Sequence, residues 1–430
     1  MVITEKIKAK NTYFAIASIF ILIYLTVFYA FGVEDSSKGL PLIAITRVFF
    51  LVIFILIIII NKSLLGLAFK YENAYIKLVI LFLTYQLFQV LFNSSPFSGL
   101  AKYLYFFSLI IVVVFIDYNN IYFKINKSNN FTIFLFIIIL GIYILYMFQH
   151  PFATSFRATR IDILNWNNNE NAGFFATVLP FIVFTLRKHK ILLWSFLAFF
   201  FYIFIFYNGS IAAIISSLII LVTYAFISSK NKKLSGIIYL IIFFVIIYLV
   251  LNQLGQFDII FSGGLKNVIA GKTQEGNLAG RIGGIWLPVL KYVSEHNFLF
   301  GFGSNSWAEV SRKAGTYWLK EAGSSNIYVF RDAHNYFIVA FVEGGIINIF
   351  FIVSFFILGI RSSLFAIRES IGEYDKKYAI TIFCSWLGLI TWCMMYNAWY
   401  SGGWYFFSLL MILSLIMKNH VKRSIRINAK

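Results

Sequence analysis

Charged side chains are scarce in this sequence: they make up 12% of its 430 residues, whereas 60% are hydrophobic. Soluble globular proteins are about 25% charged, so the composition excludes that class and indicates a polytopic membrane protein. The apolar segments are continuous runs, such as residues 51–60, and do not alternate with polar residues. They therefore predict membrane-spanning helices and argue against a membrane β-barrel.

Cysteine is also scarce, and the common nucleotide-binding and metal-binding motifs are missing. The two cysteines, Cys384 and Cys393, lie in one apolar run and are expected to be small buried hydrophobic side chains. The sequence contains no P-loop, dinucleotide-binding glycine motif, HExxH, CxxC or kinase signature. The acidic residues of its longest loop form no close carboxylate cluster. We therefore expect a reaction that needs no nucleotide, no metal ion and no cofactor.

Hydropathy predicts twelve transmembrane helices, and an even number places both termini on one side of the membrane. With the N-terminus inside, the cytoplasmic segments contain 23 lysines and arginines, against four in the short outer loops. This asymmetry sets the orientation by the positive-inside rule. It also accounts for most of the net charge of +19 through contacts with anionic lipid, without a nucleic-acid partner. The predicted helices lie near residues 12–32, 41–60, 77–93, 102–117, 131–148, 172–186, 191–207, 211–228, 234–252, 336–359, 378–398 and 404–417.

The predicted fold class is an all-α polytopic membrane protein with about 12 transmembrane helices and one long periplasmic loop domain. Residues 1–252 contain nine helices with short loops, and residues 253–335 form the loop domain. Residues 336–430 contain the last three helices and a basic cytoplasmic tail. Within the loop, residues 281–293 are helix-like, and aromatic residues follow a glycine-rich turn at residues 301–304. This composition predicts an element that lies along the membrane interface.

One histidine stands where it could take part in chemistry. His334 follows Asp332 at the start of the tenth predicted helix, where a neutral imidazole could accept a proton from a substrate hydroxyl. The alternative is a structural histidine that caps the helix. Glu343 lies within the next apolar run and must face the bundle interior, either as a structural hydrogen-bonding group or as part of a site. His189 and His420 lie in basic cytoplasmic segments and are expected to be surface residues.

Four arginines fall at or near the predicted outer face. Arg157 and Arg160 precede an asparagine-rich stretch, Arg281 opens the helix-like part of the long loop, and Arg47 lies inside the second predicted helix. A guanidinium group binds phosphate oxygens in a bidentate manner and stays charged in a poorly solvated site. Converging arginines would suit an anionic lipid headgroup or a diphosphate. The alternatives are loop ion pairs for Arg157 and Arg160, and a snorkelling side chain for Arg47.

The order of these features resembles that of the O-antigen ligase and polymerase superfamily of bacterial membrane glycosyltransferases, over roughly residues 150–360. Four pieces in sequence order carry the resemblance: Arg160 with Asn167 to Asn171 and Ala172-Gly173; Asn208-Gly209-Ser210; Arg281 with Trp286 and Gly301-Phe302-Gly303; and His334-Asn335-Tyr336 with Glu343-Gly344-Gly345. The second piece departs from the family, whose members often carry an arginine there. A phosphate-binding role at that position is therefore not transferred to this chain.

The resemblance implies a membrane enzyme of the bacterial inner membrane whose active site faces the periplasm. Such an enzyme moves a glycan from an undecaprenyl-diphosphate carrier to a sugar hydroxyl, and the carrier diphosphate is its own leaving group. His334 would act as general base, while Arg160 and Arg281 would stabilise the charge on the leaving diphosphate. The residues expected to contact substrate are Arg157, Arg47, Trp286 and Glu343.

The resemblance leaves the acceptor open. A polymerase adds the glycan to another lipid-linked repeat unit and could work with a chain-length regulator, whereas a ligase transfers it to the lipid A core. The short outer loops are not especially basic, which favours the polymerase over an enzyme for a heavily phosphorylated core. A transporter of lipid-linked sugars is the rival from another class. It would need polar groups inside the membrane, for which Gln86 and Gln89 are the candidates.

Overall fold

The computed structural model describes residues 74–91, 168–203, 211–228, 281–303, 306–322, 325–330, 333–395 and 403–428. These residues are mostly helical and include one antiparallel β-hairpin. The longer elements are α4 (Ala74–Leu91), α7 (Asn168–Leu186), α8 (Lys190–Ile203), α9 (Ile211–Ser228), α16 (Tyr336–Glu369), α17 (Glu373–Met395) and α18 (Gly403–Asn428). The shorter ones are η2 (Ile282–Trp286), α14 (Leu287–His296), α15 (Trp307–Lys313), β1 (Tyr317–Ala322) and β2 (Ser325–Phe330).

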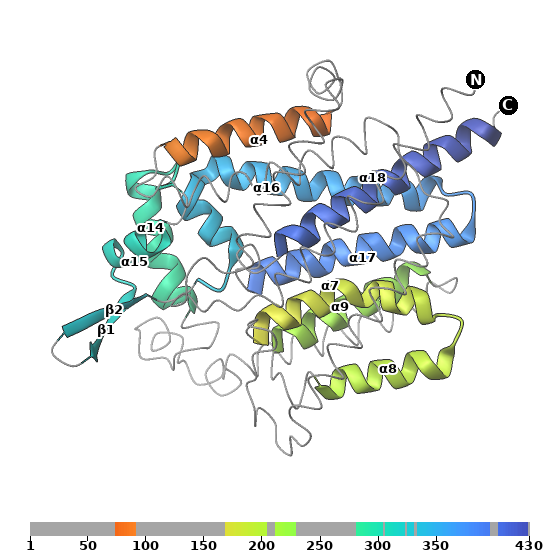
Figure 1. Ribbon diagram of the computed structural model, residues 1–430, viewed down its shortest axis with the longest axis horizontal. Helices are drawn as coiled ribbons and strands as arrows, with labels where there is room; N and C mark the ends of the chain where they lie inside the picture. The colour runs from red at the N-terminus through yellow and green to blue at the C-terminus, as the bar shows by residue number, and fades with distance from the viewer. Residues whose placement is uncertain are drawn as a thin grey trace, which may run out of the picture.

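The long helices lie side by side as a bundle, and the short elements η2, α14, α15, β1 and β2 gather at one end of it (Figure 1). Helix α17 packs against α7, α9, α16 and α18, so it is the central helix of the described bundle. Helix α4 lies against α16. The short elements lie within residues 281–330 of the predicted loop domain, and they cover one end of the described bundle.

Aromatic packing joins α16, α17 and α18. Phe356, Trp386 and Phe407 meet edge to face, with ring centroids 5.4 to 5.8 Å apart. The Trp386 side chain is fully buried, and its indole N–H donates to Ser414 Oγ at 2.9 Å. A Cβ atom at Gly359 would overlap the Trp386 ring, so this glycine allows α16 and α17 to approach closely. Both cysteines are free and fully buried in α17, as predicted.

Basic residues gather at the opposite end of the bundle from the short elements. The α7–α8 turn, the α16–α17 turn and the C-terminal part of α18 all lie there (Figure 1). Arg187 stacks over the rings of Phe184 (3.9 Å) and Tyr374 (4.9 Å). His420 Nε2 lies 2.9 Å from Asp375 Oδ2, so His420 is a partly buried partner between α17 and α18 and not the surface residue that was expected. This segregation of charge is what the positive-inside prediction requires; the assignment of each end to a membrane side stays a prediction.

Two of the described helices are long and apolar enough to cross a membrane, α16 and residues 373–394 of α17. The prediction of residues 211–228 coincides with α9, whereas α16 and α18 continue to Glu369 and Asn428, beyond their predicted ends. The apolar run that hydropathy detects ends where basic residues begin. The helix itself can continue into the polar region because its hydrogen bonds are internal. Five predicted helices, near residues 12–32, 41–60, 102–117, 131–148 and 234–252, lie outside the described residues.

The β-hairpin is a departure from the all-α prediction. Strand β1 pairs with β2 in antiparallel register, from Tyr317 opposite Phe330 to Ala322 opposite Ser325. That register leaves two residues, Gly323 and Ser324, between the strands. A Gly-Ser pair between segments rich in aromatic and β-branched residues is a recognised hairpin signal that the sequence analysis did not use.

Candidate active site

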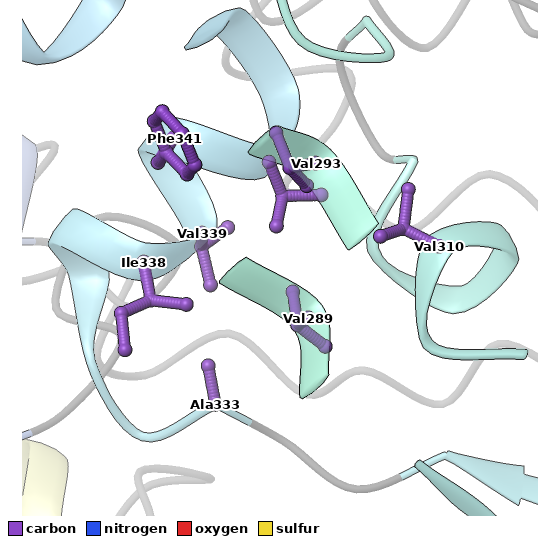
Figure 2. Close-up of a cluster of buried hydrophobic side chains, with 8 residues drawn as sticks. Val289, Val293, Val310, Ala333, Ile338, Val339 and Phe341 are labelled. Carbon is purple, nitrogen blue, oxygen red and sulfur yellow. The ribbon is translucent and has the colours of Figure 1, made fainter. Parts of the chain in front are cut away.

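A hydrophobic cluster joins the short elements to the start of α16. Figure 2 shows the side chains of α14, α15 and the beginning of α16 directed toward one another. The buried members are Val289, Val293, Val310, Ala333, Ile338, Val339, Phe341 and Val342. On the exposed side of α15, away from the cluster, the Glu309 carboxylate accepts a hydrogen bond from Lys313 and raises the pKa of that lysine. Because the cluster is continuous, the loop helices and the first turns of α16 form one packed unit.

His334 is held in an unusual backbone conformation between two anchored neighbours. Its φ of 47° makes it the only described residue other than glycine with a positive φ, a conformation that costs about 1–3 kcal/mol and is enriched at functional sites. The buried Ala333 carbonyl, on one side, accepts the indole N–H of Trp286 at 2.6 Å. On the other side, Asn335 Oδ1 accepts the backbone N–H groups of Phe337 and Ile338.

The helix cap is therefore Asn335, and His334 does not fill that structural role. The Nδ1 atom of His334 is buried.

A π-helical turn brings Arg281 and Trp286 to one side of the loop domain. In η2 the backbone N–H of Leu287 donates to the Ile282 carbonyl, five residues earlier. Residues five apart consequently lie one turn above each other, whereas in an α-helix they would lie on nearly opposite sides. Arg281 thus sits one turn before Trp286, whose indole reaches the peptide next to His334. The Trp286 N–H thereby connects the motif that contains Arg281 and Trp286 to the peptide next to His334, which belongs to another motif.

Helix α16 is broken at Gly345, where φ is 62° and ψ is −163°. The segment formed by residues 298–303, called here the inserted loop, fills the break. Its amides at Phe302 and Gly303 donate to the carbonyls of Val342 (2.9 Å) and Glu343 (2.8 Å), which end the first helical segment. Its carbonyls at residues 298 and 299 accept the amides of residues 346 and 347, at 3.0 and 3.4 Å, which begin the second. The loop thereby supplies partners to both new helix ends.

Glycine is required on both sides of this contact. Gly301 has a φ of 66°, and a Cβ atom there would lie 2.6 Å from the backbone nitrogens of Gly344 and Gly345. A Cβ atom at Gly345 would overlap the Leu299 carbonyl. Two motifs that are more than forty positions apart, Gly301-Phe302-Gly303 and Glu343-Gly344-Gly345, therefore touch through their backbones. The Glu343 side chain is 8% exposed, as a carboxylate in an apolar helix requires.

Residues 194–353 match the family model described as O-antigen ligase. The matched segment runs from α8 into α16 and contains Arg281, Trp286, His334, the inserted loop and the break. This match supports membership of the O-antigen ligase and polymerase superfamily. No single characterised protein matches it. The family is membrane-associated, and the match suggests a glycosyltransferase-like enzyme.

Several residues that the sequence analysis names lie outside the described part of the chain: Arg47, Arg157, Arg160 and the Asn208-Gly209-Ser210 segment. Gln86 and Gln89, considered as transport groups, are hydrogen-bonded inside the protein, to Asn348 Oδ1 at 3.1 Å and to the Phe300 carbonyl at 2.8 Å. Among the residues that the structure describes, no three His, Cys, Asp or Glu side chains are close enough to share a metal ion.

Proposed function

We propose that this protein transfers a glycan from an undecaprenyl-diphosphate donor to a sugar hydroxyl at the periplasmic face of the bacterial inner membrane. The family match supports glycan transfer between lipid-linked substrates in general. The observation that carries the assignment of the site is the positive-φ backbone of His334, whose preceding carbonyl accepts the indole N–H of Trp286. Evolved enzymes retain such local strain where a side chain must be held in one orientation.

In the proposed reaction, His334 accepts the proton of the acceptor hydroxyl while that oxygen attacks the anomeric carbon of the donor sugar. The bond from the anomeric carbon to the diphosphate oxygen breaks, and its electron pair leaves with undecaprenyl diphosphate. Arg281 and Arg160 stabilise the negative charge that grows on this leaving group. General-base catalysis of this kind contributes typically 10²–10⁴-fold. Arg157, Arg47 and Glu343 are proposed to contact the substrates.

For Trp286 we propose a positioning role in addition to the substrate contact expected from the sequence. Its indole N–H has the Ala333 carbonyl as its acceptor, so it is not available to donate to a sugar. The indole ring itself is partly exposed. We therefore infer that Trp286 orients the peptide before His334 through its N–H, and that only its ring face can meet a glycan.

For the acceptor, we favour another lipid-linked repeat unit, which makes the protein a polymerase. The support is the low basic content of the short outer loops. A ligase that transfers the glycan to the lipid A core is the second candidate, because the family match supports ligase and polymerase alike. A deletion strain separates the two: loss of a polymerase leaves core with a single repeat unit, whereas loss of a ligase leaves bare core and carrier-bound long chains. Gel ladders of lipopolysaccharide report which pattern appears.

The enzyme assignment is tested with purified protein and a carrier-linked glycan. New glycosidic bonds should form with the wild type, persist in EDTA, and be lost in His334→Ala and Arg281→Ala variants that remain folded and inserted. A transporter alone would form no such bond. Full activity of His334→Ala would refute the general-base role, and loss of wild-type activity in EDTA would refute metal independence.

A further inference from the structure

Helix α4 carries a buried polar stripe on the side that faces α16. Tyr85, Gln86 and Gln89 are all less than 10% exposed, while Leu87 and Phe88 on the other side are 40% and 43% exposed. Figure 1 shows α4 beside α16, with one end near the inserted loop. Buried polar side chains in an apolar helix are costly unless they are hydrogen-bonded. Helix α4 also lies outside the segment that matches the family model, so the match assigns no role to the stripe.

Two side chains of the stripe bind the break of α16 and the inserted loop together. The Tyr85 hydroxyl donates to the Gly344 carbonyl, the last acceptor of the first helical segment, and lies 3.4 Å from the Phe300 carbonyl. Gln89 Nε2 donates to the same Phe300 carbonyl and to Tyr85 Oη, each at 2.8 Å. Because Phe300 is in the middle of the inserted loop, these contacts join the loop to the helix end it covers.

A third side chain supports the same junction from the other helical segment. Gln86 Nε2 donates to Asn348 Oδ1 at 3.1 Å. The Asn348 amide nitrogen in turn donates across the break to the Ala340 carbonyl at 3.0 Å. Helix α4 therefore contacts the first segment, the second segment and the loop between them. One of the groups contacted, the Gly344 carbonyl, lies at a helix end and has no partner within its own segment. In a bilayer such a group costs several kcal/mol if it is unsatisfied.

We propose that Tyr85 and Gln89 are positioning residues for the transfer reaction, acting as a latch that holds the inserted loop in the break of α16. This inference rests on the proposed function, because the element it positions carries Glu343 and begins next to His334. The latch acts through the backbone: it sets the direction of the first segment, residues 336–344, relative to the rest of α16. Neither side chain needs to touch the substrates.

The length of the first segment explains why a latch at one end matters at the other. Nine helical residues span about 13 Å at 1.5 Å per residue. A rotation of about 10° at the break would therefore move the His334 end by roughly 2 Å. A misplacement of about 1 Å can reduce the rate of an enzyme on the order of 100-fold when it moves a catalytic group. The substrates should still bind, since the arginines proposed to hold the diphosphate lie outside the first segment.

The test uses Tyr85→Phe, Gln89→Leu and their combination, with Leu87→Ala on the exposed side of α4 as the matched control. Tyr85→Phe keeps the ring, which packs 5.7 Å from that of Phe351. We expect kcat of the double variant to fall about 10- to 100-fold with little change in KM. A loss of binding sites or of folded protein would instead raise KM or lower the amount of active enzyme.

Hydrogen exchange supplies a readout that does not depend on activity. The latch predicts faster exchange of the amides of residues 302, 303, 346 and 347 in the double variant, with α17 and the Leu87→Ala control unchanged. Unchanged exchange at those amides would overturn the latch whatever the activity. Faster exchange with an unaltered kcat would overturn its positioning role. If the double variant shows the predicted faster exchange but the wild type makes no glycosidic bond, the latch would stand and the proposed function would be refuted.

Discussion

Replacement of Gly345 by alanine is predicted to be one of the most damaging single-methyl changes in the described chain. Its φ of 62° with ψ of −163° is a backbone conformation essentially restricted to glycine, and another residue there costs about 1–3 kcal/mol. The new Cβ would also overlap the Leu299 carbonyl, so the inserted loop would have to move away. That movement gives up the hydrogen bonds from the amides of residues 346 and 347, at about 1 kcal/mol each. The expected loss is about 3–5 kcal/mol.

Gly372→Ala is the matched control, because it makes the same chemical change in the α16–α17 turn. A Cβ atom there would only make ordinary contacts, 3.8 Å from the Asp375 carboxyl group. Its free energy of unfolding should change by less than about 0.5 kcal/mol. Denaturation of both purified variants by increasing SDS, followed by tryptophan fluorescence, compares them under one condition. If Gly345→Ala were as stable as Gly372→Ala, the described contact between the inserted loop and the break would be wrong.

Three further predictions follow from single contacts. Trp286→Phe removes the N–H donated to the peptide before the candidate base, so kcat should fall about tenfold in the transfer assay while the fold is kept; an unchanged kcat would contradict the positioning role. Gly359→Ala forces a methyl group into the Trp386 ring and should lower the free energy of unfolding by about 1–3 kcal/mol, which denaturation measures. Ser294 and Lys190 are both exposed and can be replaced singly by cysteine. A membrane-impermeant thiol reagent should label the cysteine at position 294 from the periplasm and the one at position 190 from the cytoplasm. The reverse pattern would overturn the topology.

The helices of the bundle were the most predictable part of the structure. A continuous apolar run of about 18–20 residues has few alternatives in a membrane, so the predicted residues 211–228 coincide with α9. Hydropathy did not predict the break at Gly345. The apolar run continues on both sides of this residue, and hydropathy carries no information on the direction of the backbone. In the sequence, Gly344 and Gly345 are recognisable only as part of a motif. The positive φ of Gly345 is explained by the inserted loop, which packs against it in the structure.

The site residues were predictable in kind but not in their partners. Arg281, Trp286 and His334 were predicted from residue chemistry and order, and their roles stay predictions. In the structure the Trp286 N–H binds the carbonyl next to His334, and Arg281 precedes the π-helical turn that contains Trp286. The sequence could not predict that the Trp286 N–H donates to the Ala333 carbonyl, because that acceptor is 47 positions away. Periodicity reports which face of an element is apolar, and it does not report which distant backbone group comes to lie against a side chain.

The polar residues of α4 show how a local interpretation changes when the fold is known. Taken alone, two glutamines inside an apolar helix favour a path for a polar substrate, since unsatisfied amides are rarely left in a membrane. In the structure their Nε2 atoms donate to groups of the broken helix and the inserted loop, up to 262 positions away. A helix that is interrupted in the membrane needs donors and acceptors from its neighbours, and α4 supplies them. The hydrogen bonds of the two glutamines are therefore better explained by the break in α16 than by a channel. The break also divides α16 so that a short helical segment, residues 336–344, follows closely after His334.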